Sequence, residues 1–107
     1  MAVKEVSVQE LKRRLDAGEN FLLLDVREPW EVAIARLPGS TSIPLGQLSA
    51  HLAELHSDAD IIVMCKSGGR SHRATEMLTA RGFSRAANLS GGIDAWADEI
   101  DPNLPTY

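Results

Sequence analysis

The stretch Ile61-Ile62-Val63-Met64-Cys65-Lys66-Ser67-Gly68-Gly69-Arg70-Ser71 decides the fold. Its four leading apolar residues are typical of a strand that is buried on both faces, as in a parallel sheet covered by helices. The small residues after Lys66 allow a tight turn, and Arg70-Ser71 leads into a segment with helical spacing. A strand, a glycine loop and a helix start together form a nest of backbone N–H groups that suits an anion.

Cys65 is the only cysteine of the chain, and it lies at the mouth of this predicted nest. A lone cysteine at the end of an apolar strand is often a small buried hydrophobe. Here two consecutive glycines and two cations, Lys66 and Arg70, directly follow it, and a structural cysteine needs neither. Because the nest and the cations favour the thiolate, we interpret Cys65 as a nucleophile.

The composition is that of one globular domain. The chain has 107 residues, of which 44% are hydrophobic and 24% are charged, and its net charge is −4. It shows no apolar run long enough for a membrane span and no signal peptide, and one cysteine cannot form an internal disulfide. We therefore expect a cytoplasmic protein with no membrane contact, in which residues 1–107 form one domain and 101–107 an extended tail. The acidic balance argues against nucleic acid as a partner.

Apolar periodicity predicts alternating strands and helices. The expected strands are 5–6, 21–26, 41–43, 61–64 and 86–89, and the expected helices are 8–17, 45–55, a segment from 71 to about 81, and two that begin near 29 and 93. Ser7 and Glu10 fit a capping box for the first helix. The leucines of 45–55 recur at spacings of three and four, which indicates a core-facing stripe rather than a dimer seam.

Other polar residues are interpreted by their position. Asp25 and Arg27 follow an apolar run, so in a parallel sheet they should share an edge with Cys65, where we expect them to brace loops through a salt bridge. His51 and His56 lack neighbouring cysteines and are interpreted as surface residues, so no metal or cofactor is expected. His72 lies just past the loop, and we expect it to point outward rather than act as a general base for Cys65.

Four motifs in this order resemble those of a single rhodanese (sulfurtransferase) domain. They are Leu23-Leu24-Asp25-Val26-Arg27-Glu28-Pro29-Trp30-Glu31, Leu37-Pro38-Gly39-Ser40 with Ile43-Pro44, Cys65 to Ser71, and Asn88-Leu89-Ser90-Gly91-Gly92-Ile93-Asp94-Ala95-Trp96. The resemblance implies an α/β fold with a five-stranded parallel sheet, in the order 1-5-4-2-3, and helices on both faces. It also implies that Cys65 carries a persulfide. Many members have Gly-His-Ile before the Pro-Gly turn, where this chain has Ala35-Arg36-Leu37.

A narrower resemblance concerns the stretch from Ser40 to Leu45 and the closing Leu104-Pro105-Thr106-Tyr107. Both are similar to the C-terminal rhodanese domain of adenylyltransferase–sulfurtransferase proteins. This likeness implies a ubiquitin-like sulfur-carrier protein and an adenylyltransferase as partners. An excised domain and a stand-alone relative both fit the sequence.

The expected activity is a two-step sulfur transfer of the thiosulfate sulfurtransferase type. Cys65 attacks the outer sulfur of a donor such as thiosulfate, or of a persulfide protein, and an external thiol, cyanide or carrier protein then removes that sulfur from the persulfide. The backbone N–H groups of the loop would hold the persulfide, and Lys66 and Arg70 would attract the donor. The expected substrate-binding residues are Lys66, Ser67, Gly68, Gly69, Arg70 and Ser71, with Asp25 and Arg27 in support.

Two alternatives from other classes remain open. Cysteine phosphatases and arsenate reductases use a similar nest, but their pattern is Cys-x5-Arg, whereas Arg70 follows Cys65 after four residues, a loop that should be too tight for a tetrahedral phosphate. The other alternative is a binding module that uses the fold only to dock a partner, which the intact cysteine and its flanking cations disfavour.

Overall fold

Five parallel strands form one sheet with helices on both faces in the computed structural model, which describes residues 3–107. The strands are β1 (Glu5–Val6), β2 (Leu22–Asp25), β3 (Thr41–Ser42), β4 (Ile61–Met64) and β5 (Ala86–Leu89). The helices are α1 (Val8–Asp16), α2 (Pro29–Ile34), α3 (Gly69–Ala80), α4 (Gly92–Glu99) and the 3₁₀ helix η1 (Leu45–Glu54). The order β1-β5-β4-β2-β3 confirms the order that the resemblance implied.

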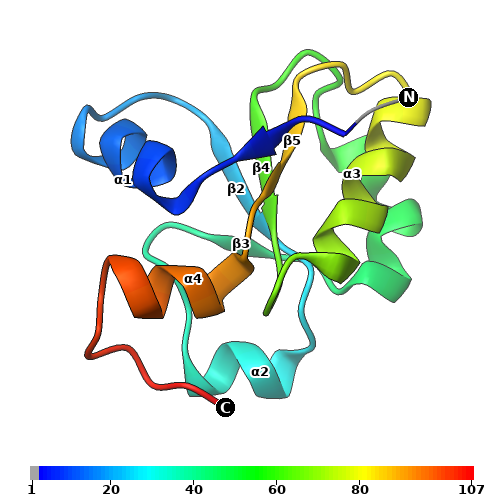
Figure 1. Cartoon of the computed structure of the whole chain (residues 1–107). Coiled ribbons are helices and arrows are strands. Elements are labelled where there is room, and N and C mark those ends of the chain that lie inside the picture. Colours follow the sequence, from blue (N-terminus) through cyan, green and yellow to red (C-terminus); the bar gives the residue numbers. More distant parts are fainter. Residues whose placement is uncertain (1–2) are drawn as a thin grey trace.

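The two faces of the sheet bury two separate apolar clusters. Along β4, Ile61 and Val63 pack toward α3 and η1, whereas Ile62 and Met64 pack toward α1 and α4. Figure 1 shows α3 on one side of the sheet and α1 with α4 on the other. Every residue of β4 is buried, because side chains alternate along a strand and helices cover both faces.

The first helix begins as its capping signal indicates, with one difference. The Ser7 hydroxyl accepts a hydrogen bond from the Glu10 backbone N–H at 3.1 Å, so the serine half of the predicted capping box is confirmed. The Glu10 carboxylate does not return to the cap, because it pairs with the Arg13 guanidinium at 2.7 Å. The opposite charge one turn along the helix competes successfully with the backbone N–H of the cap.

The segment 45–55 is helical, but its helix is of the 3₁₀ type. Two of the three leucine spacings equal three residues, which matches the three residues per turn of a 3₁₀ helix, and Gly46 weakens the α-helical alternative. The core-facing stripe is confirmed, since Leu48 is fully buried and the other three leucines pack against the α3 side of the core. His51 forms an ion pair with Glu54, and His56 is exposed.

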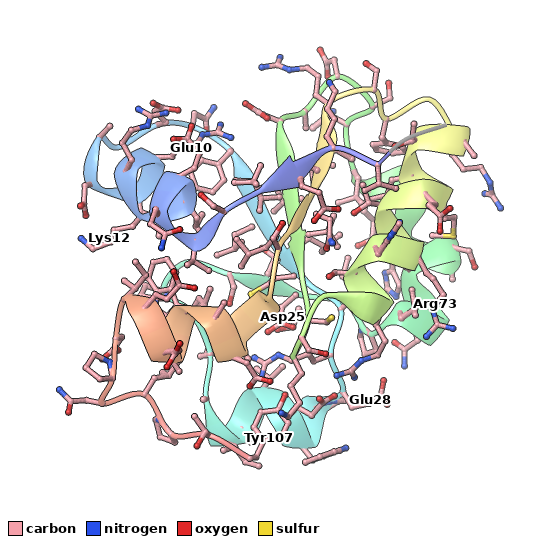
Figure 2. All side chains as sticks on the ribbon, viewed as in Figure 1. Glu10, Lys12, Asp25, Glu28, Arg73 and Tyr107 are labelled. Carbon is pink, nitrogen blue, oxygen red and sulfur yellow. The ribbon has the colours of Figure 1, made fainter. Side chains whose placement is uncertain are left out.

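Residues 101–107 turn back over the molecule. They begin with a turn in which the Leu104 N–H bonds to the Asp101 carbonyl, and Leu104 packs on the apolar cluster between the sheet and α4. Tyr107 then lies beside α2, as Figure 2 shows. No helix within residues 3–107 combines the length and the apolar character that a membrane crossing requires.

The start of α4 holds the end of β4 in place. The backbone N–H groups of Ile93 and Asp94 donate to the carbonyl oxygens of Cys65 and Lys66 at 2.9 and 3.0 Å. Gly92 allows this approach, because it has a φ of +59° and a Cβ atom at this position would collide with those same two carbonyl oxygens.

We therefore predict that Gly92→Ala lowers the free energy of unfolding by about 3 kcal/mol, from backbone strain plus the clash. The matched control is Gly18→Ala, which has a similar φ of +66° but no atom within 4 Å of the added Cβ. The control should lose only about 1 kcal/mol. Urea unfolding of both variants measures the difference, and equal losses would show that the contact between α4 and the Cys65 loop is not tight.

Candidate functional site

The carboxyl ends of β2, β4 and β5 meet at one edge of the sheet. Asp25 is paired in register with Met64, so Cys65 follows β4 directly beside the end of β2. The β4 strand pairs with β5 on its other side, which brings Asn88 to the same edge. Loops beyond the carboxyl ends of parallel strands are where ligands bind in open α/β sheets. Cys65, Asp25 and Arg27 therefore share the edge that carries the candidate site.

The Cys65 side chain is only 1% exposed, and its sulfur lies inside a cradle of donors. The Sγ atom accepts hydrogen bonds from the backbone N–H of Gly68 at 3.1 Å and of Ser71 at 3.4 Å, and the Ser71 hydroxyl lies 3.3 Å away. Burial by itself raises the pKa of the thiol, but the hydrogen bonds from Ser71, Gly68 and Ser67 outweigh it, so the pKa is lowered from its ordinary value. The loop thus favours a thiolate.

The Ser71 hydroxyl is shared between the sulfur and two oxygen acceptors, the Asn88 side chain and the Gly68 carbonyl, which lies 3.2 Å away. Its oxygen lies 2.5 Å from Oδ1 of Asn88 and 3.3 Å from the Cys65 sulfur, but a hydroxyl has one hydrogen to donate. The Asn88 amide nitrogen faces the Glu5 carboxylate at 3.3 Å, which keeps the amide oxygen turned toward Ser71. The backbone N–H groups therefore always donate to the sulfur, whereas the hydroxyl has a single hydrogen that is divided among several acceptors.

Arg70 is held by a buried carboxylate. Glu31 is 3% exposed, and its two oxygens accept from the Arg70 guanidinium at 2.6 and 2.7 Å in a bidentate pair. Glu31 also accepts from the Tyr107 hydroxyl at 2.8 Å and from the Glu28 backbone N–H at 2.8 Å. The Arg70 hydrogen bonds lower the pKa of Glu31 to about 2 despite its burial, with smaller help from Glu28 and Tyr107. The pair anchors the loop to the first turn of α2.

Asp25 and Arg27 form a fully buried ion pair below this layer. The Arg27 guanidinium donates to Asp25 at 2.6 Å, to the backbone carbonyl of Ala35 at 2.8 Å and to the Tyr107 hydroxyl at 3.1 Å. These bonds join β2 to the C-terminal end of α2 and to the closing tail. A buried pair of this kind is held by its full set of hydrogen bonds, and removing one partner is strongly destabilising. No contact of either residue reaches the sulfur directly.

Lys66 is also paired. Its ammonium group lies 2.9 Å from the Asp94 carboxylate and 5.1 Å from the centre of the Tyr107 ring. The Tyr107 ring meets the exposed Trp30 edge to face at 5.6 Å. The tail residue Tyr107 thus joins Lys66, Arg27, Glu31 and Trp30 into one wall of the site.

A cavity of about 520 Å³ opens from Cys65 along the start of α3. It is lined by Cys65, Ser67, Gly69, Arg70, His72, Arg73 and Glu76. The His72 ring is partly buried and its Nε2 atom forms no hydrogen bond within residues 3–107. His72 is therefore part of the cavity wall, although none of the donors to the Cys65 sulfur comes from it. A larger cavity of about 700 Å³ lies along α2, but Cys65 does not line it, so thiol chemistry belongs to the smaller one.

Sequence reasoning did not single out three of these residues. Glu31 stands at the third position of α2, where a capping box places a glutamate, so its backbone contact has a sequence signal, but its pairing with Arg70 has none. Tyr107 carries no local signal. Arg73 does carry one, because the dipole disfavours a cation in the first turn of a helix and so predicts a compensating anion, but sequence reasoning did not count Arg73 among the site residues. The predicted residues from Cys65 to Ser71 all lie at the loop, with Asp25 and Arg27 beneath it.

The Glu31–Arg70 pair should make stability depend on pH. The folded-state pKa of Glu31 is lowered from 4.5 to about 2, so the stabilisation is complete above pH 4.5 and is lost as the pH falls toward 2. We predict that Glu31→Gln costs up to about 3 kcal/mol of unfolding free energy at neutral pH, and that its difference from wild type shrinks below pH 4.5. The exposed Glu10, which pairs with Arg13, offers a matched control as Glu10→Gln, with little effect expected. A pH-independent difference in urea unfolding would contradict the assignment.

The hydrogen bond from the Ser71 hydroxyl to the sulfur leads to a prediction for the pKa of Cys65. Ser71→Ala should raise the pKa of Cys65, because it removes a donor that favours the thiolate. The loss is about 1 kcal/mol, or about a fivefold lower thiolate fraction, since both backbone donors remain. The pH dependence of alkylation by iodoacetamide measures it. Ser40→Ala removes a buried hydroxyl that bonds the Leu37 carbonyl instead, and it should leave the profile unchanged.

Comparisons with known proteins identify the family. Residues 7–99 match the family described as Rhodanese-like domain. A sulfurtransferase of Allochromatium vinosum is 37% identical over 95 residues, covering 89% of each protein. Adenylyltransferase and sulfurtransferase MOCS3 of Arabidopsis thaliana is 35% identical, and the match spans 99% of this chain but 26% of that protein. A rhodanese-like domain protein of Staphylococcus aureus has a crystal structure with a TM-score of 0.85, 30% identity and coverage of 98% and 99%.

Several relatives are much longer than the part they share with this chain. The Rhodanese-like/PpiC domain-containing protein 12 of Arabidopsis thaliana is 38% identical, and the match spans 38% of its length. The shared part is the parallel sheet with its cysteine loop, which the family match covers almost completely. The chain belongs to the rhodanese-like family.

Proposed function

We propose that this chain is a sulfurtransferase that carries sulfane sulfur as a persulfide on Cys65. The observation that carries the proposal is a nearly buried sulfur that accepts hydrogen bonds from the Ser71 hydroxyl and from backbone N–H groups, so that its pKa is lowered despite burial. An ordinary buried cysteine would have a raised pKa and no reactivity. The relatives named sulfurtransferase support the same class of reaction.

The cradle has unused donors for one additional sulfur atom. The backbone N–H groups of Gly69 and Arg70 begin α3, where a helix supplies no internal acceptor, and neither forms a hydrogen bond within residues 3–107. A terminal persulfide sulfur is an anion at the positive end of the α3 dipole. These N–H groups therefore suit the persulfide form of Cys65, in the same way that the N–H groups of Gly68 and Ser71 suit the free thiolate.

The reaction balances in two displacements. The Cys65 thiolate attacks the outer sulfur of thiosulfate, its bond to that sulfur forms, and sulfite leaves with the electron pair of the broken S–S bond. An acceptor such as cyanide then attacks the outer sulfur of the persulfide, giving thiocyanate and restoring the thiolate. No second cysteine is present to resolve the persulfide, so the acceptor is external. The proposed donors are thiosulfate or a protein persulfide, and the proposed acceptors are a thiol, cyanide or a ubiquitin-like sulfur carrier.

The carrier and an adenylyltransferase as partners rest on the relatives. Proteins named adenylyltransferase and sulfurtransferase from Zea mays and Arabidopsis thaliana match 95% and 99% of this chain with about a quarter of their own length. In such proteins the name joins the two activities in one polypeptide. We propose that this chain supplies the sulfur-transfer part of a comparable pair of reactions.

The test is to incubate the protein with thiosulfate and determine its intact mass. We expect a gain of one sulfur atom, absent in Cys65→Ser, and removal of that sulfur by cyanide with release of thiocyanate. An aryl thiosulfonate serves as a second donor in case the physiological donor is not thiosulfate. If neither donor loads sulfur onto the wild type, the result would favour the alternative of a non-catalytic binding module. Cys65-dependent hydrolysis of an aryl phosphate would instead support the phosphatase alternative.

A further inference from the structure

The cations nearest the thiol in sequence already have anionic partners. Arg70 is bound in a bidentate pair to Glu31, and Lys66 is paired with Asp94. The chain as a whole carries a net charge of −4, so a doubly negative donor approaches a protein that repels it at long range. A further positive charge is needed where the donor must rest.

Arg73 meets this need. It lines the cavity that contains Cys65, and within residues 3–107 it forms no ion pair and no side-chain hydrogen bond. Figure 2 shows its side chain extending from the first turns of α3. Arg73 lies one turn closer to the loop than Glu76, the acidic residue of the same cavity, and the two form no ion pair. The guanidinium is therefore available to a ligand.

A second unpartnered group lies in the same cavity. The Nε2 atom of His72 is buried and has no hydrogen-bond partner within residues 3–107. A buried polar atom without a partner carries a desolvation penalty that a ligand would relieve. Arg73 thus offers a charged fork in the cavity that Cys65 lines, and His72 adds a buried polar atom without a partner in the wall of the same cavity, which fits the oxygens of a sulfonate group.

We propose that Arg73 is the substrate-binding residue that selects anionic sulfur donors, with its guanidinium on the sulfonate oxygens of a thiosulfate or thiosulfonate. The inference deepens the proposed sulfurtransferase function and rests on it for the identity of the donor. With the oxidised sulfur group of the donor on Arg73, the outer sulfur faces Cys65. Sulfite then leaves along the cavity when the donor is thiosulfate, and a sulfinate leaves when the donor is a thiosulfonate. Lys66 and Arg70 then hold the loop in shape, and Arg73 receives the donor.

The experiment compares alkylation of Cys65 by iodoacetate, which is negatively charged, and by iodoacetamide, which is neutral. The ratio of the two rates cancels changes in thiol pKa and in exposure. We expect Arg73→Gln to lower this ratio about tenfold at low salt, with a smaller effect at high salt, because a charge-assisted contact is lost. The iodoacetamide rate itself should stay close to wild type, which shows that the loop is intact.

Two variants on the same helix serve as controls. Arg81→Gln removes an equal charge at the far end of α3 and should leave the ratio nearly unchanged. Glu76→Gln should raise the ratio, since it removes the negative charge of the same cavity. If the ratio of the two alkylation rates falls equally in Arg73→Gln and Arg81→Gln, the effect comes from net charge alone and the proposal is overturned. An unchanged ratio in Arg73→Gln would also overturn it.

A second experiment compares two sulfur donors in persulfide loading. In persulfide loading, Arg73→Gln should raise the KM for thiosulfate more than the KM for an aryl thiosulfonate, which carries one charge fewer. An equal rise for the two donors overturns the selection of donors by charge. If the wild type loads no sulfur while the alkylation ratio still depends on Arg73, the sulfurtransferase function fails and the anion site stands.

Discussion

The site depends on a sulfur atom that is buried and whose pKa is nevertheless lowered. Burial pushes the pKa of Cys65 upward, and hydrogen bonds from the Ser71 hydroxyl and from directed backbone N–H groups bring it down. Those groups come from a loop that would be flexible in isolation, because it is built from Ser67, Gly68 and Gly69. Gly68 adopts a φ of +110°, which lets its N–H turn inward to the sulfur. The reactivity of the thiol is thus a property of backbone geometry, and anything that holds the loop controls it.

The charged residues around the loop are mainly the means of holding it. Arg70 ties the start of α3 to Glu31 on α2, and Lys66 ties the end of β4 to Asp94 on α4. Beneath them the Asp25–Arg27 pair is completely buried and reaches the tail through Tyr107. Lys66, Arg70 and Arg27 are therefore placed to orient the backbone rather than to meet a ligand. This arrangement explains why a chain with a net negative charge has so many arginines at one edge of its sheet.

The sequence predicts the local features of this site and misses the distant ones. One continuous stretch predicts the strand Ile61–Met64, the glycine turn and the nucleophile. This is possible because a strand buried on both faces is apolar and a left-handed turn contains glycine, and both can be recognised in the sequence. The strand order came from the resemblance to a family, since apolar runs alone do not say which strands pair. The contacts of Glu31 with Arg70 and of Tyr107 with Arg27 join residues 39 and 80 positions apart, and charges in a sequence do not name their partners. Lys66 and Arg70 look free in the sequence for the same reason. The 3₁₀ geometry of 45–54 was missed because spacings of three and four suit both helix types until packing decides between them.

The same geometry constrains the order of events at the thiol. Tyr107, Trp30 and the Lys66–Asp94 pair build a wall on the α2 and α4 side of the loop, while the cavity opens along α3. With Cys65 only 1% exposed, the donor and the acceptor of the proposed sulfur transfer must use the same approach to a single sulfur. They cannot occupy it together, so the donor's remnant has to leave before the acceptor enters. The proposed persulfide has to be sheltered from water between these two steps, and a sulfur enclosed by backbone N–H groups would have that shelter.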